Sequence, residues 1–248
     1  MLTHGDLCTG IGGFALAASW MGWTTKWVSE IDPYCVRRLA ERFPHAPNVG
    51  DLTTADWSHW PRVDVLTAGF PCQPVSYAGK RLAQDDDRWL WPDVARAVRD
   101  LRPRYVVLEN VPGLLTRGMG DVLGGLAALG YDAEWEVRSA ASVGAPHERE
   151  RVWIVAHPDG VRCSGPWERR ASVRPTPDAY RQADRLVHAV REGALPFVCG
   201  GHDGLSPRVD ESAVAALGNA VVPQVVMAGP FALVARMERE RQAVEDAA

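Results

Sequence analysis

The chain has 248 residues, of which 46% are hydrophobic and 23% are charged, as is typical of a globular protein with a sizeable core. No apolar run approaches the ~20 residues of a membrane-spanning helix and the first residues do not resemble a signal peptide, so we expect a cytoplasmic protein without a membrane segment. The net charge of −4 gives no sign of a strongly basic protein, and five cysteines without a CxxC pair argue against a disulfide framework or a metal site.

Short apolar, β-branched runs alternate with helix-like stretches in the first part of the chain. Buried parallel strands are expected at 26–29, 63–68, 105–108 and 152–156. Helices are expected at 14–21, 33–42, 91–101 and 120–129. This alternation is typical of an α/β domain in which helices flank a mostly parallel sheet.

The pattern changes at residue 158. Residues 158–208 are rich in proline, glycine and arginine, with eight arginines against six acidic residues and one expected helix at 178–190. The excess of arginine favours a polyanionic partner, although an ordinary solvated loop region has the same composition. A helical pattern returns at 223–241. The sequence therefore predicts a main domain, an irregular insert and a final segment that rejoins the main domain.

A glycine-rich segment, DLCTGIGGF, follows the first apolar residues and opens the first expected helix. Its glycines allow a tight turn and a close approach of ligand to a helix N-terminus, as in a plain strand-to-helix turn. Two acids follow near later strand ends, Glu30 in SEID and Asp51 in GDL. Rossmann-like domains hold ribose hydroxyls with an acid at the second strand's end, and a further acid can accept from an adenine amino group. Each acid alone is compatible with a surface carboxylate, but their order predicts a nucleotide-type cofactor site.

The stretch GFPCQPVS places Cys72 between two prolines, directly after an expected strand. Cys72 is either a small buried side chain or a nucleophile held by a rigid turn. Glu109, in ENV, ends the next strand, and Arg149 and Arg151 share one face of an extended chain before the last strand. Ligands bind at the carboxyl ends of the strands in open α/β sheets. We therefore expect a thiol, a carboxyl and two guanidinium groups to converge on one pocket.

Together these segments resemble the DNA (cytosine-5)-methyltransferases. The resemblance covers residues 5–157 and 214–227 and follows the family's order: DLCTGIGGF, SEID, GDL, GFPCQPVS, ENV, RERVWIVA and LGNAVVPQ. It implies a Rossmann-like S-adenosylmethionine-dependent methyltransferase fold with a small irregular target-recognition insert. Residues 1–157 would form the catalytic and cofactor-binding domain, 158–213 a short target-recognition region, and 214–248 a C-terminal segment that returns to the catalytic domain.

The resemblance also implies a role for each catalytic residue. Cys72 would add to C6 of a flipped-out cytosine, which makes C5 nucleophilic toward the methyl group of S-adenosyl-L-methionine. Glu109 would hold or protonate N3 of the base. Arg151, with Arg149, would bind O2 and the developing negative charge. Residues 73–89 would form a mobile loop that closes on DNA.

The cofactor contacts implied by the resemblance come from four segments. Those at the methionine end are Cys8, Gly10, Ile11 and Gly13. Glu30 would take the ribose, Ile31 would flank the adenine, and Asp51 with Leu52 would contact it. The pocket would be closed from the C-terminal side by Asn219 and Ala220.

The expected partner is double-stranded DNA, bound by a monomer, and it stays open whether a cognate restriction endonuclease accompanies the protein. Two alternatives to the DNA reading are methylation of cytosine C5 in RNA and a non-catalytic DNA-binding remnant. The non-catalytic alternative is suggested by the short stretch between WIVA and LGNAVV, where the family usually has a longer recognition domain. Intact Cys72, Glu109 and Arg151 argue against it.

Overall fold

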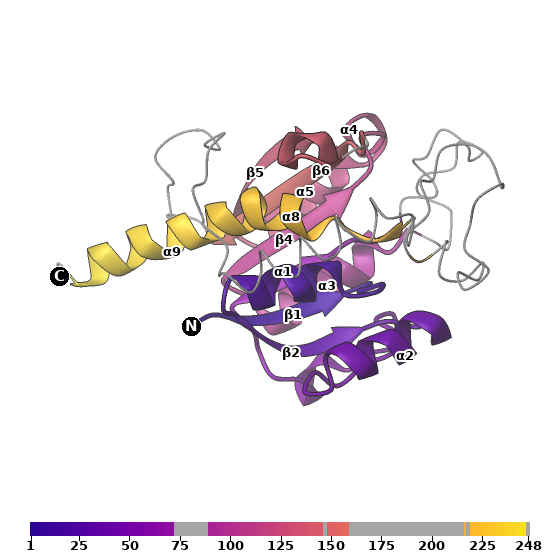
Figure 1. Ribbon diagram of the computed structural model, residues 1–248. Helices are drawn as coiled ribbons and strands as arrows, with labels where there is room; N and C mark the ends of the chain where they lie inside the picture. Colours follow the sequence, from indigo (N-terminus) through magenta and orange to yellow (C-terminus); the bar gives the residue numbers. More distant parts are fainter. Residues whose placement is uncertain (72–88, 146–147, 159–215, 217–218, 247–248) are drawn as a thin grey trace.

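A computed structural model describes residues 1–71, 89–145, 148–158, 216 and 219–246 of the chain. Its centre is one sheet of six strands with helices on both faces (Figure 1). The α/β fold with a mostly parallel sheet is therefore confirmed. The expected helix at 178–190 lies outside the described residues, and the proposed limits of the recognition region stay a prediction.

The sheet has the strand order β2-β1-β3-β4-β6-β5. Its strands are β1 (Thr3–Leu7), β2 (Thr24–Ser29), β3 (Val65–Ala68), β4 (Tyr105–Asn110), β5 (Tyr131–Arg138) and β6 (Arg151–Pro158). Neighbours from β2 to β4 are parallel, whereas β6 pairs antiparallel with both β4 and β5.

The expectation of a parallel strand at 152–156 is wrong, because β6 runs opposite to the other strands. In residues 139–150, which connect β5 to β6, the structure describes only a 3₁₀ turn at Ala140–Val143 and not the crossover helix that usually joins parallel strands. Strand β5 itself was not expected. It lies at the edge of the sheet and alternates polar and apolar residues, with Trp135 and Val137 exposed.

Four helices begin and end close to the expected positions: α1 (Gly13–Trp20), α2 (Pro33–Arg42), α3 (Trp91–Leu101) and α5 (Met119–Ala128). The short helix α4 (Leu114–Arg117) and the 3₁₀ turns η1 (Trp57–His59) and η2 (Ala140–Val143) were not expected. The start of α2 is fixed by Asp32, whose side chain accepts hydrogen bonds from the backbone N–H groups of Tyr34 and Cys35. None of the described helices is long and apolar enough to cross a membrane.

Two helices, α8 (Pro223–Ala228) and α9 (Pro230–Asp246), replace the single C-terminal helix expected at 223–241. Pro230 begins α9, because proline fits the first turn of a helix but not its interior. Both helices pack on the same face of the sheet as α1, where Phe231 contacts Phe14 and Trp23. The chain's last segment thus lies beside its first helix (Figure 1).

The opposite face of the sheet carries α3, α4 and α5. Their buried residues, including Val94, Val98 and Leu126, pack against Leu66 and Leu108 of the central strands. The two apolar layers leave the carboxyl ends of β1 to β4 at one edge of the sheet, and the site is built at that edge.

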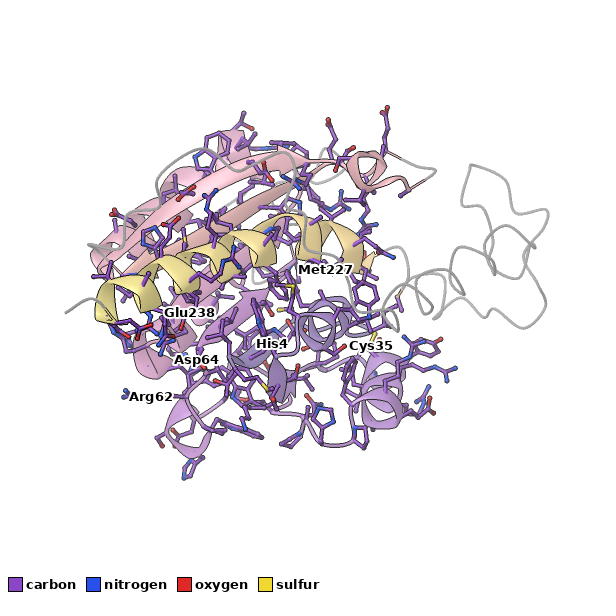
Figure 2. The ribbon with its side chains drawn as sticks, turned by 60° about the vertical axis from the view of Figure 1, so that its left-hand side comes forward. His4, Cys35, Arg62, Asp64, Met227 and Glu238 are labelled. Atoms are coloured by element: carbon purple, nitrogen blue, oxygen red, sulfur yellow. The ribbon has the colours of Figure 1, made fainter. Side chains whose placement is uncertain are left out.

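Glu238 of α9 ties the C-terminal helix to the sheet. Its carboxylate pairs with Arg104 at 2.8 Å and Arg241 at 2.7 Å, and Tyr105 Oη donates to it at 3.0 Å. Arg104 also reaches Asp64 at 3.4 Å, and Figure 2 shows Asp64 and Glu238 near each other. The hydrogen bonds from Arg241 and Tyr105, with the charge of Arg104, lower the pKa of Glu238 to about 2.

Replacing Glu238 by glutamine is expected to lower the free energy of unfolding by about 1–2 kcal/mol near pH 7. Because the folded pKa lies below the ordinary value of 4.5, the stabilisation is complete above that value and is lost as pH falls toward 2. Thermal unfolding of both proteins between pH 7 and pH 2 measures this. The exposed pair of Glu41 with Arg38 supplies a control, Glu41→Gln, that should barely change stability. A difference in stability between wild type and Glu238→Gln that stays constant at every pH would contradict the lowered pKa of Glu238.

Candidate active site

Residues at the carboxyl ends of four parallel strands form the candidate site. The glycine-rich turn follows β1, Glu30 follows β2, Gly69–Pro71 follow β3, and Glu109 and Asn110 end β4. Strand β6 runs the other way, so its first residue, Arg151, also lies at this edge. The antiparallel direction therefore brings the arginines to the site.

Glu109 and Arg151 form a buried ion pair, with Arg151 Nε 2.9 Å from Glu109 Oε1. Glu109 is 8% exposed. Burial raises its pKa, although the positive charges of Arg151 and Arg149 act to lower it. Burial, together with the charge of Arg151, lowers the pKa of Arg149. The three expected residues thus lie within electrostatic reach of one another, and burial makes the carboxyl of Glu109 easier to protonate than an exposed glutamate.

The turn that leads to Cys72 lies against Glu109, although Cys72 itself and the expected mobile loop lie outside the described residues. A Cβ built on Gly69 would be 3.5 Å from Glu109 Oε2. Asn110 Nδ2 donates to the Phe70 carbonyl at 3.3 Å, and Asn110 Oδ1 accepts from the Val111 N–H at 2.9 Å. The buried amide of Asn110 therefore links the end of β4 to this turn, a role that sequence reasoning missed.

The glycine-rich turn is held by Glu30. The Gly10 N–H donates to Glu30 Oε2 at 2.7 Å, and the N–H groups of Ile31 and Asp32 donate to Oε1 at 2.8 Å each. Gly10 and Gly12 have φ values of 57° and 92°, in the left-handed region that favours glycine. Cys8 also has a positive φ, 51°, at the start of this turn.

The C-terminal segment meets the same turn through Val221. A Cβ on Gly13 would lie 2.6 Å from the Val221 carbonyl oxygen, so only glycine allows this approach without a shift. Val221 also lies 3.5 Å from the position of a Cβ on Gly69. Asn219 is exposed and Ala220 half-buried just before it. Val221, which was not among the expected residues, therefore lies against both the glycine-rich turn and the turn before Cys72.

Asp51 and Leu52 lie beyond Glu30 at the same edge. The third strand expected before Asp51 is reduced to one parallel bridge between Val28 and Asn48. Asp51 Oδ1 accepts from the N–H and the hydroxyl of Thr53, both at 2.8 Å, which leaves Oδ2 for a ligand. Leu52 is buried in the core, whereas Ile31 is 70% exposed.

Carboxylates surround this end of the site. Burial, together with the charges of Glu30, Asp6 and Asp51, raises the pKa of the Cys8 thiol. Asp6 is fully buried and accepts a hydrogen bond from Thr67 Oγ1 at 2.6 Å, and burial raises its pKa to about 8. Its Oδ2 has no hydrogen-bond partner among the described residues. Glu30, Asp6 and Asp51 thus lie within electrostatic reach of the glycine-rich turn.

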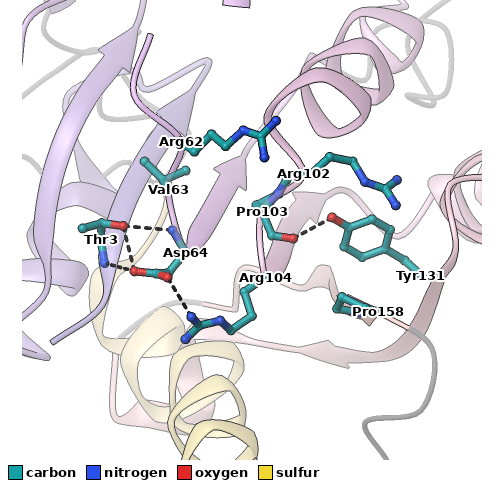
Figure 3. A pocket seen from close by; sticks show the side chains of 9 residues that line it. All are labelled: Thr3, Arg62, Val63, Asp64, Arg102, Pro103, Arg104, Tyr131 and Pro158. Carbon is teal, nitrogen blue, oxygen red and sulfur yellow. Dashed lines mark hydrogen bonds and ion pairs between the residues drawn. The ribbon is translucent and has the colours of Figure 1, made fainter.

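An open groove of about 400 Å³ lies at the opposite edge of the sheet (Figure 3). Arg62, Arg102 and Arg104 line it, but Arg104 pairs with Asp64 and Glu238. Arg102 donates to the Leu129 carbonyl at 2.7 Å and lies over the Tyr131 ring. These contacts are structural, and the groove lies away from the candidate active site.

Comparison with known proteins places these features in one family. The family model described as "C-5 cytosine-specific DNA methylase" matches residues 2–189. Type II methyltransferase M.BsuFI of Bacillus subtilis is 39% identical over 164 residues, which cover 64% of this chain and 40% of that protein. Type II methyltransferase M.NlaIV of Neisseria lactamica is 38% identical over 138 residues, covering 51% and 33%. This chain spans a third to half the length of these and similar curated relatives.

Solved structures show the same fold at lower identity. Dnmt2 methyltransferase of S. pombe superposes with a TM-score of 0.64 at 14% identity, covering 98% of this chain and 99% of that chain. A DNMT2 variant of Spodoptera frugiperda gives a TM-score of 0.55 at 21% identity, covering 69% and 54%.

Proposed function

The chain belongs to the C-5 cytosine-specific DNA methylase family, and on that premise we propose that it transfers a methyl group from S-adenosyl-L-methionine to C5 of cytosine in double-stranded DNA. The observation that carries the proposal is the buried Glu109–Arg151 pair, which lies against the turn leading to Cys72. Cytosine N3 and O2 both accept hydrogen bonds, and a protonated carboxyl and a guanidinium at this place would both donate them.

C5 of cytosine is a poor nucleophile, so the reaction needs activation of the ring. The thiolate of Cys72 adds to C6 and forms a carbon–sulfur bond, while Glu109 gives a proton to N3 and Arg151 stabilises the charge that develops on O2. S-adenosyl-L-methionine would supply the methyl group: its methyl–sulfur bond would break as C5 bonds to the methyl carbon, and neutral S-adenosylhomocysteine would be released. A base would then remove the C5 proton, the carbon–sulfur bond of Cys72 would break with its electron pair returning to the thiolate, and N3 would return its proton to Glu109. The target base must leave the helix stack to reach Cys72.

The cofactor would be held by residues from all four segments at the sheet edge. Glu30 would accept from the ribose hydroxyls and Asp51 Oδ2 from the adenine amino group, while the open backbone at Gly10 would face the methionine end. The surrounding carboxylates suit the positive charge of this cofactor. The remaining expected contacts are Cys8, Ile11, Gly13, Ile31, Leu52, Asn219 and Ala220.

Incubating the purified protein with methyl-tritiated S-adenosyl-L-methionine and either duplex DNA or tRNA tests the proposal. We expect label in duplex DNA drawn from a host without cytosine-5 methylation, and none in tRNA. Transfer to tRNA alone would favour the RNA alternative. Binding of duplex DNA with no transfer to either acceptor would favour the non-catalytic remnant and would overturn the proposal.

A further inference from the structure

The segment from Gly50 to Ala55, called here the adenine loop, contains Asp51 and Leu52 but no helix or strand. The bridge between Val28 and Asn48 is the one β contact that the structure describes just before it. A full strand would fix the loop through a ladder of backbone hydrogen bonds. The position of the loop therefore depends on side chains.

Arg96 of α3 supplies most of these side-chain bonds. Its Nη1 donates to the Ala55 carbonyl at 2.8 Å, and its Nη2 donates to the carbonyls of Leu52 and Thr53 at 2.5 and 3.0 Å. Asp93, one turn earlier on α3, lies 3.6 Å from Nη2. A planar guanidinium can serve three carbonyls at once, whereas the compact ammonium of lysine cannot reproduce that fork.

The other end of the adenine loop is joined to Glu30 by Asn48. The Glu30 N–H donates to Asn48 Oδ1 at 3.0 Å, and Asn48 Nδ2 donates to the Glu30 carbonyl at 2.9 Å. The Gly50 N–H also donates to Asn48 Oδ1, at 3.1 Å. One amide thus fixes the spacing between the loop that carries Glu30 and the loop that carries Asp51.

We propose that Arg96 and Asn48 are positioning residues that hold Asp51 and Glu30 at the spacing required by the adenosyl half of the cofactor. The inference rests on the proposed function, which gives Glu30 to the ribose and Asp51 to the adenine. Neither residue touches the reacting atoms. Loss of the Arg96 contacts frees the loop before the cofactor binds, so binding must then order it and the affinity falls.

The test compares wild type with Arg96→Lys, Asn48→Ala and the control Arg99→Ala. Arg99 lies on the same helix, is exposed and pairs with the adjacent Asp100. Titration calorimetry with S-adenosyl-L-methionine gives the affinity, and amide hydrogen exchange of the cofactor-free protein reports the order of residues 50–55. Turnover on duplex DNA separates KM for the cofactor from kcat.

We expect Arg96→Lys to weaken cofactor binding by about tenfold, which matches the loss of a hydrogen bond made by a charged group. Asn48→Ala should weaken it by about threefold to tenfold, because its hydrogen bonds join neutral, exposed groups. Exchange should rise in residues 50–55, kcat should stay within about twofold of wild type, and Arg99→Ala should behave as wild type. Faster exchange in this loop with unchanged affinity would overturn the inference, as would unchanged exchange. Wild type that binds no S-adenosyl-L-methionine would instead refute the proposed function on which the inference rests.

Discussion

Replacing Glu109 by glutamine should reduce kcat for methyl transfer by about 10²–10⁴-fold, the usual contribution of a positioned general acid. Glutamine keeps the size of the side chain and can still accept a hydrogen bond from Arg151, but it has no acidic proton to give to N3. Burial raises the pKa of Glu109, so its carboxyl takes up a proton more readily than an exposed glutamate does, as this step requires. Steady-state kinetics with duplex DNA measures the loss.

A matched control for Glu109 exists in the same sheet. Glu136 pairs with Arg138 at 2.6 Å on β5, and burial raises its pKa as well. Glu136→Gln removes a carboxyl from a half-buried ion pair on the edge strand that contributes no proposed catalytic residue, so its kcat should match wild type. Equal losses in both variants would mean that Glu109 acts only through stability, and unchanged activity in Glu109→Gln would contradict its role as proton donor.

Replacing Cys72 by alanine should abolish methyl transfer altogether, because the proposed mechanism needs the thiolate of Cys72 to form the bond to C6. Duplex DNA that carries 5-fluorocytosine should trap the wild-type protein, because the fluorine at C5 cannot leave as a proton does and the carbon–sulfur bond then persists. We expect a covalent protein–DNA species on a denaturing gel with wild type and none with Cys72→Ala.

Cys35 provides the control for this experiment. It is a free, buried cysteine on α2, and Cys35→Ala should still form the trapped species. Trapping that persists in Cys72→Ala would assign the nucleophile to another residue and would refute the proposed mechanism.

Most of the fold could be predicted from local patterns. The parallel strands at 26–29, 63–68 and 105–108 and the helices at 33–42 and 91–101 are strongly patterned, and the structure places β2, β3, β4, α2 and α3 there. The edge strand β5 was not predicted, because its polar and apolar residues alternate and it lacks the continuous apolar run of a buried strand.

The direction of β6 was predicted wrongly from the sequence. Its run from Val152 to Ala156 is apolar and buried, like the parallel strands, so periodicity alone cannot give its direction. A parallel strand there would place Arg151 at the far edge of the sheet, away from Glu109. The convergence of these two residues was expected from the order of the motifs, and only the antiparallel pairing of β4 with β6 makes it possible.

The side chains that support the site could not be identified from sequence in the same way. Glu30 follows the end of β2 and Asp51 follows the bridge at Asn48, and the motifs SEID and GDL mark both residues in the sequence. Asn110 and Arg96 act through backbone carbonyls about 40 residues away along the chain, and Asp6 lies inside a buried strand. No local pattern in a single sequence predicts which carbonyl a distant side chain reaches.

Bisulfite sequencing of host DNA after expression of wild type and of Cys72→Ala tests the central claim most directly. The proposed function predicts protected cytosines in one short sequence context with wild type and none with the variant. Folded wild-type protein that leaves every cytosine unprotected, or a variant that protects the same sites, would contradict the account.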